Sequence, residues 1–207
     1  MTSDPLIAML DAFAPDGPEE AHDVARVRAL AMTGDAWGRD TALHVTGSAL
    51  VLHPPTGRVL LRWHERMQSW LQVGGHGDAG EVDPYAVAFR EAREETGLDD
   101  LRAWPDPAGP VAVQVVCVPV PPGKGEPAHE HADVRYLLAT DHPEAAVQEH
   151  ETALIAWHTV ADALELVAEE NLRVCLRRTD RALSRWERVA EGRVRARLRA
   201  DSSASPG

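Results

Sequence analysis

Residues 74–98 constrain the fold more than any other stretch of the chain, because they contain a helix with a clear beginning and end. Asp83 can serve as the N-cap, and Pro84 suits the first helical position, where its missing N–H would be unpaired in any case. Gly97 stands where a left-handed C-terminal cap is expected. Between these ends, apolar residues recur at helical spacing and predict a buried stripe made of Tyr85, Ala88, Phe89, Ala92 and Thr96.

The same helix carries three glutamates on an arc beside that stripe. At roughly 100° per residue, Glu91, Glu94 and Glu95 fall close together on the helix surface. Like charges at this spacing repel one another, and the repulsion grows as the site dries. A bound cation would offset it, and carboxylate ligands suit Mg²⁺ or Mn²⁺. The alternative interpretation is a solvated acidic face without a ligand.

The glycines and charged residues around this helix resemble the Nudix box, G-x5-E-x7-R-E-U-x-E-E-x-G-U, in which U is a bulky aliphatic residue. The matching residues are Gly75, Glu81, Arg90, Glu91, Glu94, Glu95, Gly97 and Leu98. The chain departs from the pattern twice. Eight residues instead of seven separate Glu81 from Arg90, and Ala92 occupies the first U position. The longer loop bears on the role of Glu81, whereas neither departure touches the three glutamates of the helix.

The resemblance to the Nudix family implies an α+β fold, an α/β/α sandwich with a mixed β-sheet. It implies a hydrolase that cleaves a diphosphate bond in a nucleoside diphosphate linked to another moiety. The implied cofactor is Mg²⁺ or Mn²⁺, held by Glu91, Glu94, Glu95 and the carbonyl of Gly75. Arg90 is expected to pair with a box glutamate and orient it, with a phosphate contact as the competing role. Glu94 is the general-base candidate within the box, and the candidates outside it are Glu130, Glu149 and Glu151.

His129, His131 and Asp133 form a second group of candidate ligands. Alternate residues of an extended chain share one side, so this trio has the composition of a Zn²⁺ site. The alternatives are that the residues line the substrate pocket or that they have a structural role where a loop meets a strand. His76, inside the box, is a candidate for contact with substrate phosphate. We therefore count His76, His129 and His131 as expected substrate-binding residues.

Composition limits the partners and the compartment. The net charge of −12 argues against nucleic acid as the main partner, but a small-molecule nucleotide remains a fitting substrate because a metal can neutralise its phosphates. No stretch approaches the ~20 apolar residues of a membrane helix, and no signal peptide is expected. Cys117 and Cys175 lie in apolar runs and are expected to be buried free thiols. These features predict a cytoplasmic protein without a membrane partner.

The rest of the chain alternates between strand and helix patterns. Strands are expected at residues 44–52, 58–63, 70–73, 111–120, 131–139 and 152–158, and the long apolar run 111–120 is expected to be a central strand. Further helices are expected at residues 4–13, 19–32, 161–167 and 172–190. Residues 121–130 are expected to form a flexible loop beside the site.

These segments divide the chain into four parts: an N-terminal helical extension (1–41), a Nudix domain (42–167), a C-terminal helix (168–200) and a disordered tail (201–207). The extension is expected to pack onto the domain or to take part in a homodimer interface. The arginine-rich C-terminal helix favours a solvated face over an RNA-binding one. Two functions follow: an active hydrolase, or a Nudix-fold module that binds a ligand or regulates without useful catalysis.

Overall fold

The computed structural model describes residues 4–123 and 125–203, with side chains described as far as Val189. Among these residues, eight strands form one sheet. The order across it is β3 (Ser69–Leu71), β2 (Arg58–His64), β1 (Leu43–His53), β7 (His129–Ala139) and β5 (Arg102–Ala103). In addition, β4 (Val73–His76) pairs with β1, β6 (Gln114–Val120) with β7, and β8 (Ile155–Thr159) with β2. The sheet is mixed because β1 and β7 run parallel and the other pairs are antiparallel.

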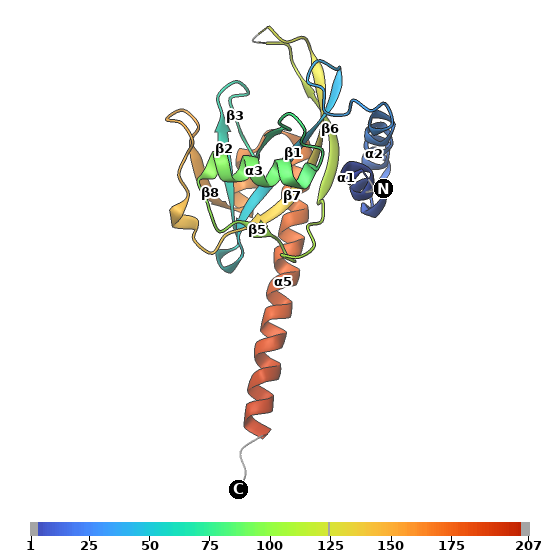
Figure 1. The fold of residues 1–207 in the computed structure, drawn as a ribbon. Helices are drawn as coiled ribbons and strands as arrows, with labels where there is room; N and C mark the ends of the chain where they lie inside the picture. The colour runs from blue at the N-terminus through green and yellow to red at the C-terminus, as the bar shows by residue number, and fades with distance from the viewer. Residues whose placement is uncertain (1–3, 124, 204–207) are drawn as a thin grey trace.

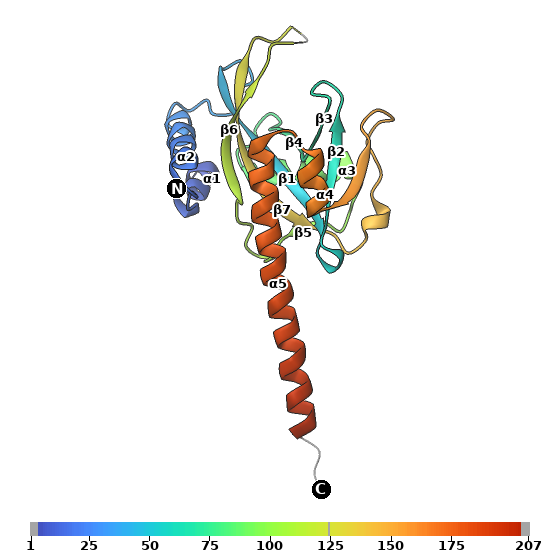
Figure 2. The same ribbon diagram turned by 180° about the vertical axis from the view of Figure 1, so that it is seen from behind.

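Helices cover both faces of this sheet (Figure 1). Helix α3 (Pro84–Thr96) lies on one face. The view from behind shows α4 (Val160–Leu166) and the first part of α5 (Glu170–Ser203) on the other face, with the rest of α5 projecting well beyond the sheet (Figure 2). Helices α1 (Pro5–Ala12) and α2 (Pro18–Ala31) lie beside β6, and short 3-10 helices span Pro54–Thr56 and Pro143–Ala145. The predicted α/β/α sandwich with helical additions at both ends is confirmed.

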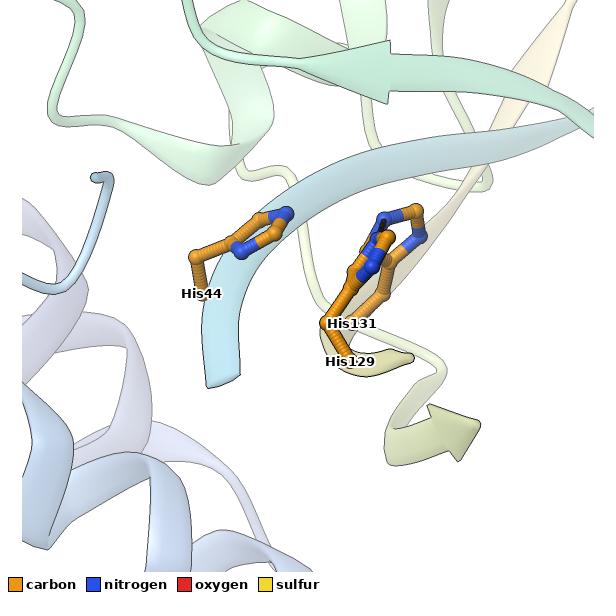
Figure 3. A group of neighbouring side chains, drawn as sticks. All are labelled: His44, His129 and His131. Carbon is orange, nitrogen blue, oxygen red and sulfur yellow. Dashed lines mark hydrogen bonds between the residues drawn. The ribbon is translucent and has the colours of Figure 1, made fainter. Parts of the chain in front are cut away.

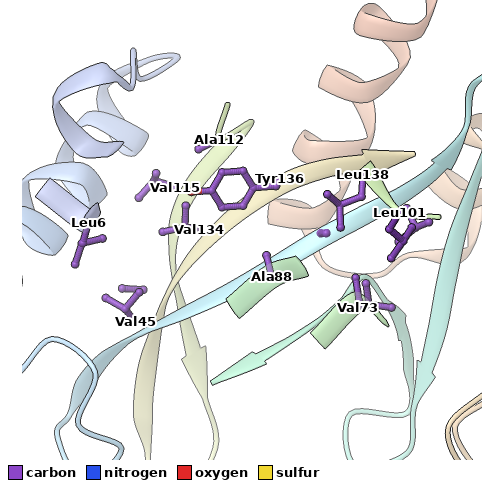
Figure 4. Close-up of a cluster of buried hydrophobic side chains, with 14 of the residues drawn as sticks. Leu6, Val45, Val73, Ala88, Leu101, Ala112, Val115, Val134, Tyr136 and Leu138 are labelled. Carbon is purple, nitrogen blue, oxygen red and sulfur yellow. The ribbon is translucent and has the colours of Figure 1, made fainter. Parts of the chain in front are cut away.

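Strand β1 is buried on both sides because helices cover both. Val45, Ala49 and Val51 belong to the apolar cluster on the α3 side, part of which is drawn in Figure 4. Leu50 and Leu52 belong to the cluster on the α4 and α5 side. This alternation follows from the two-residue period of a strand, whose successive side chains point to opposite faces. The same residues therefore join the two helical layers to one sheet and hold α3 in a fixed position.

Helix α3 approaches β1 most closely at Gly47. A Cβ atom on Gly47 would lie 2.5 Å from the carbonyl oxygen of Pro84 and 2.9 Å from the backbone nitrogen of Ala88. Backbone atoms of a packed helix have little room to move, so only glycine fits at this crossing. The contact sets the height of the glutamate-bearing helix above the sheet.

We expect Gly47→Ala to destabilise the protein by about 1–3 kcal/mol, the usual cost of overpacking a core. The measurement is the free energy of unfolding in urea. Gly109→Ala is the matched control, since its added Cβ would meet only Asp106 at an ordinary contact distance of 3.4 Å. Equal stability of the Gly47 and Gly109 variants would contradict the close packing of α3 on β1.

The prediction that residues 111–120 form a central strand is wrong. Strand β6 begins at Gln114 and pairs only with β7 among the described strands, so it lies at an edge. Its outward backbone N–H groups are instead bonded to carboxylates of α2: Val115 N–H donates to Glu20 Oε1 (3.2 Å) and Cys117 N–H to Asp23 Oδ2 (3.0 Å). A helix therefore covers this edge, which explains why the strand has the apolar sequence of an interior one.

Other expectations need smaller corrections. The predicted strand 70–73 is divided, because β3 pairs with β2 whereas β4 pairs with β1. The short strand β5 was not predicted. The loop predicted for residues 121–130 ends earlier, since β7 begins at His129. Helix α5 runs through residues 201–203, which were assigned to a disordered tail, and residues 204–207 of that tail lie outside the described part.

The terminal helices pack against the domain. Leu6, Leu10 and Val27 of the N-terminal extension are part of the α3-side core. Arg178 of α5 forms a salt bridge with Glu20 of α2 at 2.7 Å, so one arginine of the C-terminal helix has an internal role. The side chains of Arg193, Arg195, Arg197 and Arg199 lie outside the described part.

Cys117 and Cys175 are free thiols, as predicted, with Cys175 buried and Cys117 half-buried. Within the described residues, no helix has both the length and the apolarity needed to cross a membrane.

Candidate active site

Helix α3 begins and ends where the sequence predicts. The Asp83 carboxylate accepts a hydrogen bond from the N–H of Tyr85 at 2.9 Å, and Gly97 adopts the left-handed conformation with φ 65°. Tyr85 and Phe89 of the predicted stripe are only half-buried, whereas Ala88, Ala92 and Thr96 are fully buried. The helix thus has the predicted register, and two of its glutamates, Glu91 and Glu95, face β4, the strand that precedes it.

The three helix glutamates do not share one environment. Glu95 is 8% exposed and faces the sheet, Glu91 is half-buried one turn earlier, and the side chain of Glu94 is 55% exposed. Burial raises the pKa of Glu91, and it raises the pKa of Glu95 to about 7 although Arg62 lies close by. Burial away from water disfavours the ionised form of both carboxylates. A cation bound beside them would remove that penalty.

The two glycines of β4 allow these carboxylates to approach the strand. A Cβ on Gly75 would lie 2.7 Å from the Cδ atom of Glu91, so any other residue there would displace the Glu91 carboxylate from its present position. Gly74, with φ 146°, donates its N–H to Glu95 Oε2 at 3.0 Å, while Arg62 Nη1 lies 3.2 Å from Glu95 Oε1. The carboxylates of Glu91 and Glu95 therefore lie against the backbone of β4 along one short stretch.

Arg90 connects the residues of the box. Its Nη1 donates to Glu91 Oε1 at 2.9 Å and to Glu94 Oε2 at 3.0 Å. Its Nη2 donates to Glu81 Oε2 and to the carbonyl of His76, both at 2.9 Å. The hydrogen bond from Arg90 lowers the pKa of Glu81 and keeps that side chain ionised. The extra residue between Glu81 and Arg90 is absorbed by the loop, because the two side chains still meet.

A cleft of about 390 Å³ opens beside β4. Gly74, Gly75 and Glu95 line one part of it, and three cationic side chains line other parts: Arg62, Arg66 and Arg135. Of the expected substrate-binding residues, His76, His129 and His131 all line this cleft. The structure thus brings part of the box, Gly75 and Glu95, to the same cavity as the histidines, whereas Arg90 and Glu94 line a different one.

Asp133 does not join the histidines, contrary to the composition of the predicted trio. Its carboxylate accepts hydrogen bonds from Thr46 at 3.1 Å, Ser48 at 2.9 Å, Gln72 at 3.2 Å and Arg135 Nε at 2.8 Å. These bonds fill its acceptor positions and make it the centre of a polar network on the cleft wall. Asp133 would have to lose some of these hydrogen bonds to bind a metal ion.

Two other histidines take the place of Asp133. His44 of β1 is buried, and its ring lies 5.0 Å from that of His131 and 5.2 Å from that of His129, measured between centroids. The three rings gather at the start of β1 and β7 (Figure 3). His76 Nε2 lies 3.0 Å from His44 Nε2. The sequence analysis missed His44, because its neighbours come from a strand some ninety residues later, and only the parallel pairing of His44 with His131 reveals it.

The candidate general bases outside the box lie in different places. Glu130 is held by Arg26 in a salt bridge of 2.5 Å and has its pKa lowered by that arginine. Glu149 lies 3.5 Å from Arg62 Nη2, and Arg62 in turn contacts Glu95. Glu151 is exposed. By position, Glu149 is therefore the strongest candidate outside the box, and Glu94 remains the candidate within it.

The fold and these residues identify the class of protein. The family profile described as NUDIX domain matches residues 43–179, which is more than half of the chain and extends beyond residue 167 into α5. The chain therefore belongs to the NUDIX family, and it is a hydrolase of the class that acts on acid anhydrides. A comparison with curated proteins gives no match.

The chain is similar to several solved structures. An Ap4A hydrolase from C. elegans, in a binary complex, is 19% identical and covers 68% of this chain and 97% of its own, with a TM-score of 0.54. The dihydroneopterin triphosphate pyrophosphohydrolase of E. coli is 20% identical over 63% of this chain and 91% of its own, with a TM-score of 0.46. A MutT NUDIX hydrolase from Burkholderia pseudomallei is 18% identical over 67% and 98%, with a TM-score of 0.47.

Proposed function

We propose that the chain is a Mg²⁺- or Mn²⁺-dependent hydrolase of a diphosphate bond in a nucleoside diphosphate linked to another moiety. The observation that carries the proposal is the contact between α3 and β4. Glu91 and Glu95 pack on β4 at its two glycines, Gly74 and Gly75, and this strand lines a cleft that also holds three arginines. A cleft that carries both arginines and carboxylates suits a substrate whose phosphates contact an arginine on one side and a carboxylate-bound cation on the other.

The donor set fits a hard divalent ion. Glu91, Glu94 and Glu95 would hold it together with the carbonyl of Gly75, and all of these donors are oxygens. The raised pKa of Glu91 and that of Glu95 support this assignment, because both carboxylates gain from a positive neighbour. When bound, such an ion neutralises phosphate charge and lowers the pKa of a coordinated water.

The remaining residues position the reactants. Arg90 holds Glu91 and Glu94 through one nitrogen, so its proposed role is to orient these carboxylates rather than to bind phosphate. Glu94 is the proposed general base, since it is the most exposed helix glutamate and can reach solvent. Arg66 and the histidines His76, His129 and His131 are proposed to contact the substrate from the opposite part of the cleft. A small nucleotide matches the cleft volume of about 390 Å³.

The test is a hydrolysis assay on purified protein with a panel of nucleoside triphosphates, nucleotide sugars, dinucleoside polyphosphates and coenzyme-type dinucleotides. The products are resolved by ion-exchange chromatography, so that the cleaved bond is identified. We expect one compound class to be hydrolysed with Mg²⁺ or Mn²⁺ and to remain intact with a chelator. Ligand-induced thermal shifts without hydrolysis of any compound would favour a binding module instead.

A further inference from the structure

Four imidazoles converge beside the box, and the substrate contact proposed above for three of them does not require their rings to gather around the buried His44. They come from three strands: His44 from β1, His76 from β4, and His129 and His131 from β7. We propose that His44, His129 and His131 form a second metal site, which binds a divalent transition-metal ion of the Zn²⁺ type and is distinct from the carboxylate site of the box. Figure 3 shows these three side chains.

The spacing of the nitrogens fits such an ion. One ring nitrogen from each of the three histidines lies within 4.8 Å of the others, and Nε2 of His129 is 3.2 Å from Nε2 of His131. A tetrahedral Zn²⁺ ion with bonds of about 2.0–2.1 Å holds neighbouring ligand nitrogens roughly 3.3 Å apart. The pair on β7 already has this separation, and His44 completes a three-ligand set across the parallel β1–β7 pair.

In two of these rings, His44 and His129, the Nδ1 atom is hydrogen-bonded to a backbone carbonyl, as is common for histidines that bind a metal through Nε2. Nδ1 of His44 lies 3.2 Å from the carbonyl oxygen of Thr41, and Nδ1 of His129 lies 2.9 Å from that of Pro127. A carbonyl oxygen only accepts, so both Nδ1 atoms carry the proton and donate it. Nε2 of each ring is then left with its lone pair directed into the cluster, which is how backbone carbonyls orient imidazole ligands.

The surroundings disfavour the charged form of two of the three imidazoles, His44 and His131. Burial lowers the pKa of His44, and it lowers the pKa of His131 to about 3, with the neighbouring imidazoles adding to the effect. Asp133, two residues along β7, is bound to Arg135, and its negative charge offsets only part of the lowering of the His131 pKa. Imidazole nitrogen ligands prefer Zn²⁺, Co²⁺, Ni²⁺ or Cu²⁺ and bind Mg²⁺ poorly. The two sites of the cleft therefore differ in chemistry: oxygen donors on α3 and nitrogen donors on β1 and β7.

His76 links the cluster to the box. Its Nε2 lies 3.0 Å from Nε2 of His44, the atom that a metal would engage, and its backbone carbonyl accepts a hydrogen bond from Arg90. Since His44 Nε2 has one lone pair, a metal ion and His76 compete for it. A metal ion bound by His44, His129 and His131 would thus displace His76, the neighbour of Gly75, from His44. His76 is not one of the three proposed ligands.

The experiment uses full-length protein without a histidine tag, stripped with chelator and dialysed. Zn²⁺ is added in isothermal titration calorimetry with millimolar Mg²⁺ present, and Co²⁺ is added in a parallel absorption titration, because its visible spectrum reports nitrogen ligation and geometry. We expect one equivalent of each metal to bind, with a rise in Tm on addition of Zn²⁺. No stoichiometric binding, or displacement of Zn²⁺ by millimolar Mg²⁺, would overturn the proposal.

Variants then locate the site. His129→Gln and His131→Gln are each expected to weaken Zn²⁺ binding by more than about 100-fold, since loss of an outer-shell partner alone costs about 10–100-fold. His142→Gln is the matched control, because this histidine is 65% exposed and lies outside the cluster. Glu94→Gln should retain Zn²⁺ binding, and loss of binding there would assign the ion to the box instead. Circular dichroism checks that each variant is folded, and the wild-type titration decides the proposal even if a variant unfolds.

Discussion

Glu94→Gln is expected to lower kcat about 10²–10⁴-fold, the range associated with loss of a general acid or base. The substitution removes the negative charge that we assign to metal binding and to water activation, and it keeps the size of the side chain. Because the Glu94 side chain is 55% exposed and bonds only Arg90 among the described residues, the folded structure should persist. The measurement is the steady-state rate on the substrate identified in the hydrolysis assay, at saturating Mg²⁺ or Mn²⁺.

Glu187→Gln is the matched control for this variant, since Glu187 is an exposed glutamate on a helix, outside the cleft. Its kcat should equal that of the wild type. Unfolding midpoints in urea should agree among the three proteins. Turnover of Glu94→Gln close to the wild-type rate would contradict the assignment of Glu94 to metal binding and to general-base catalysis.

Arg90→Lys is expected to reduce activity about 10–100-fold at low metal concentration and to raise the metal concentration needed for half-maximal rate. Lysine keeps the charge but has no planar fork, so it would hold fewer of the carboxylates that Arg90 now joins. Those carboxylates belong to Glu81, Glu91 and Glu94. The measurement is a metal titration of the rate at fixed substrate, followed by a substrate titration at saturating metal.

Arg93→Lys is the control for Arg90→Lys, because Arg93 lies on the same helix and its only salt bridge among the described residues is to Asp99. It should leave both titrations unchanged. The competing role of Arg90, a direct phosphate contact, makes a different prediction: KM for substrate would rise while the metal requirement stayed the same. That result would exclude the orienting role.

The box helix was predictable from sequence because its determinants are local. Asp83 caps the helix two residues away, and Gly97 ends it through its own backbone conformation. The grouping of the three glutamates was also predicted from helical periodicity. Periodicity alone left their environments undetermined, and packing on β4 buries Glu95 while it leaves Glu94 in solvent. Their separate roles as ligand or base therefore stay proposals built on tertiary contacts.

The edge position of β6 shows the opposite situation. Its apolar sequence resembles that of an interior strand, and what distinguishes the two cases is a pair of carboxylates on α2, Glu20 and Asp23. They lie more than ninety residues earlier in the chain. Nothing in the local pattern of residues 111–120 indicates that side chains of a helix replace a neighbouring strand there.

The sequence by itself determined the Nudix box, its helix and the class of hydrolase, because the box is a fixed spacing of charges and glycines along one short segment. It also pointed to His129 and His131. Only the tertiary structure decided that Asp133 belongs to a separate polar network and that His44 and His76 complete the histidine cluster. The physical reason is strand pairing: the parallel register that sets His44 beside His131 joins segments distant in sequence, and no local pattern encodes it.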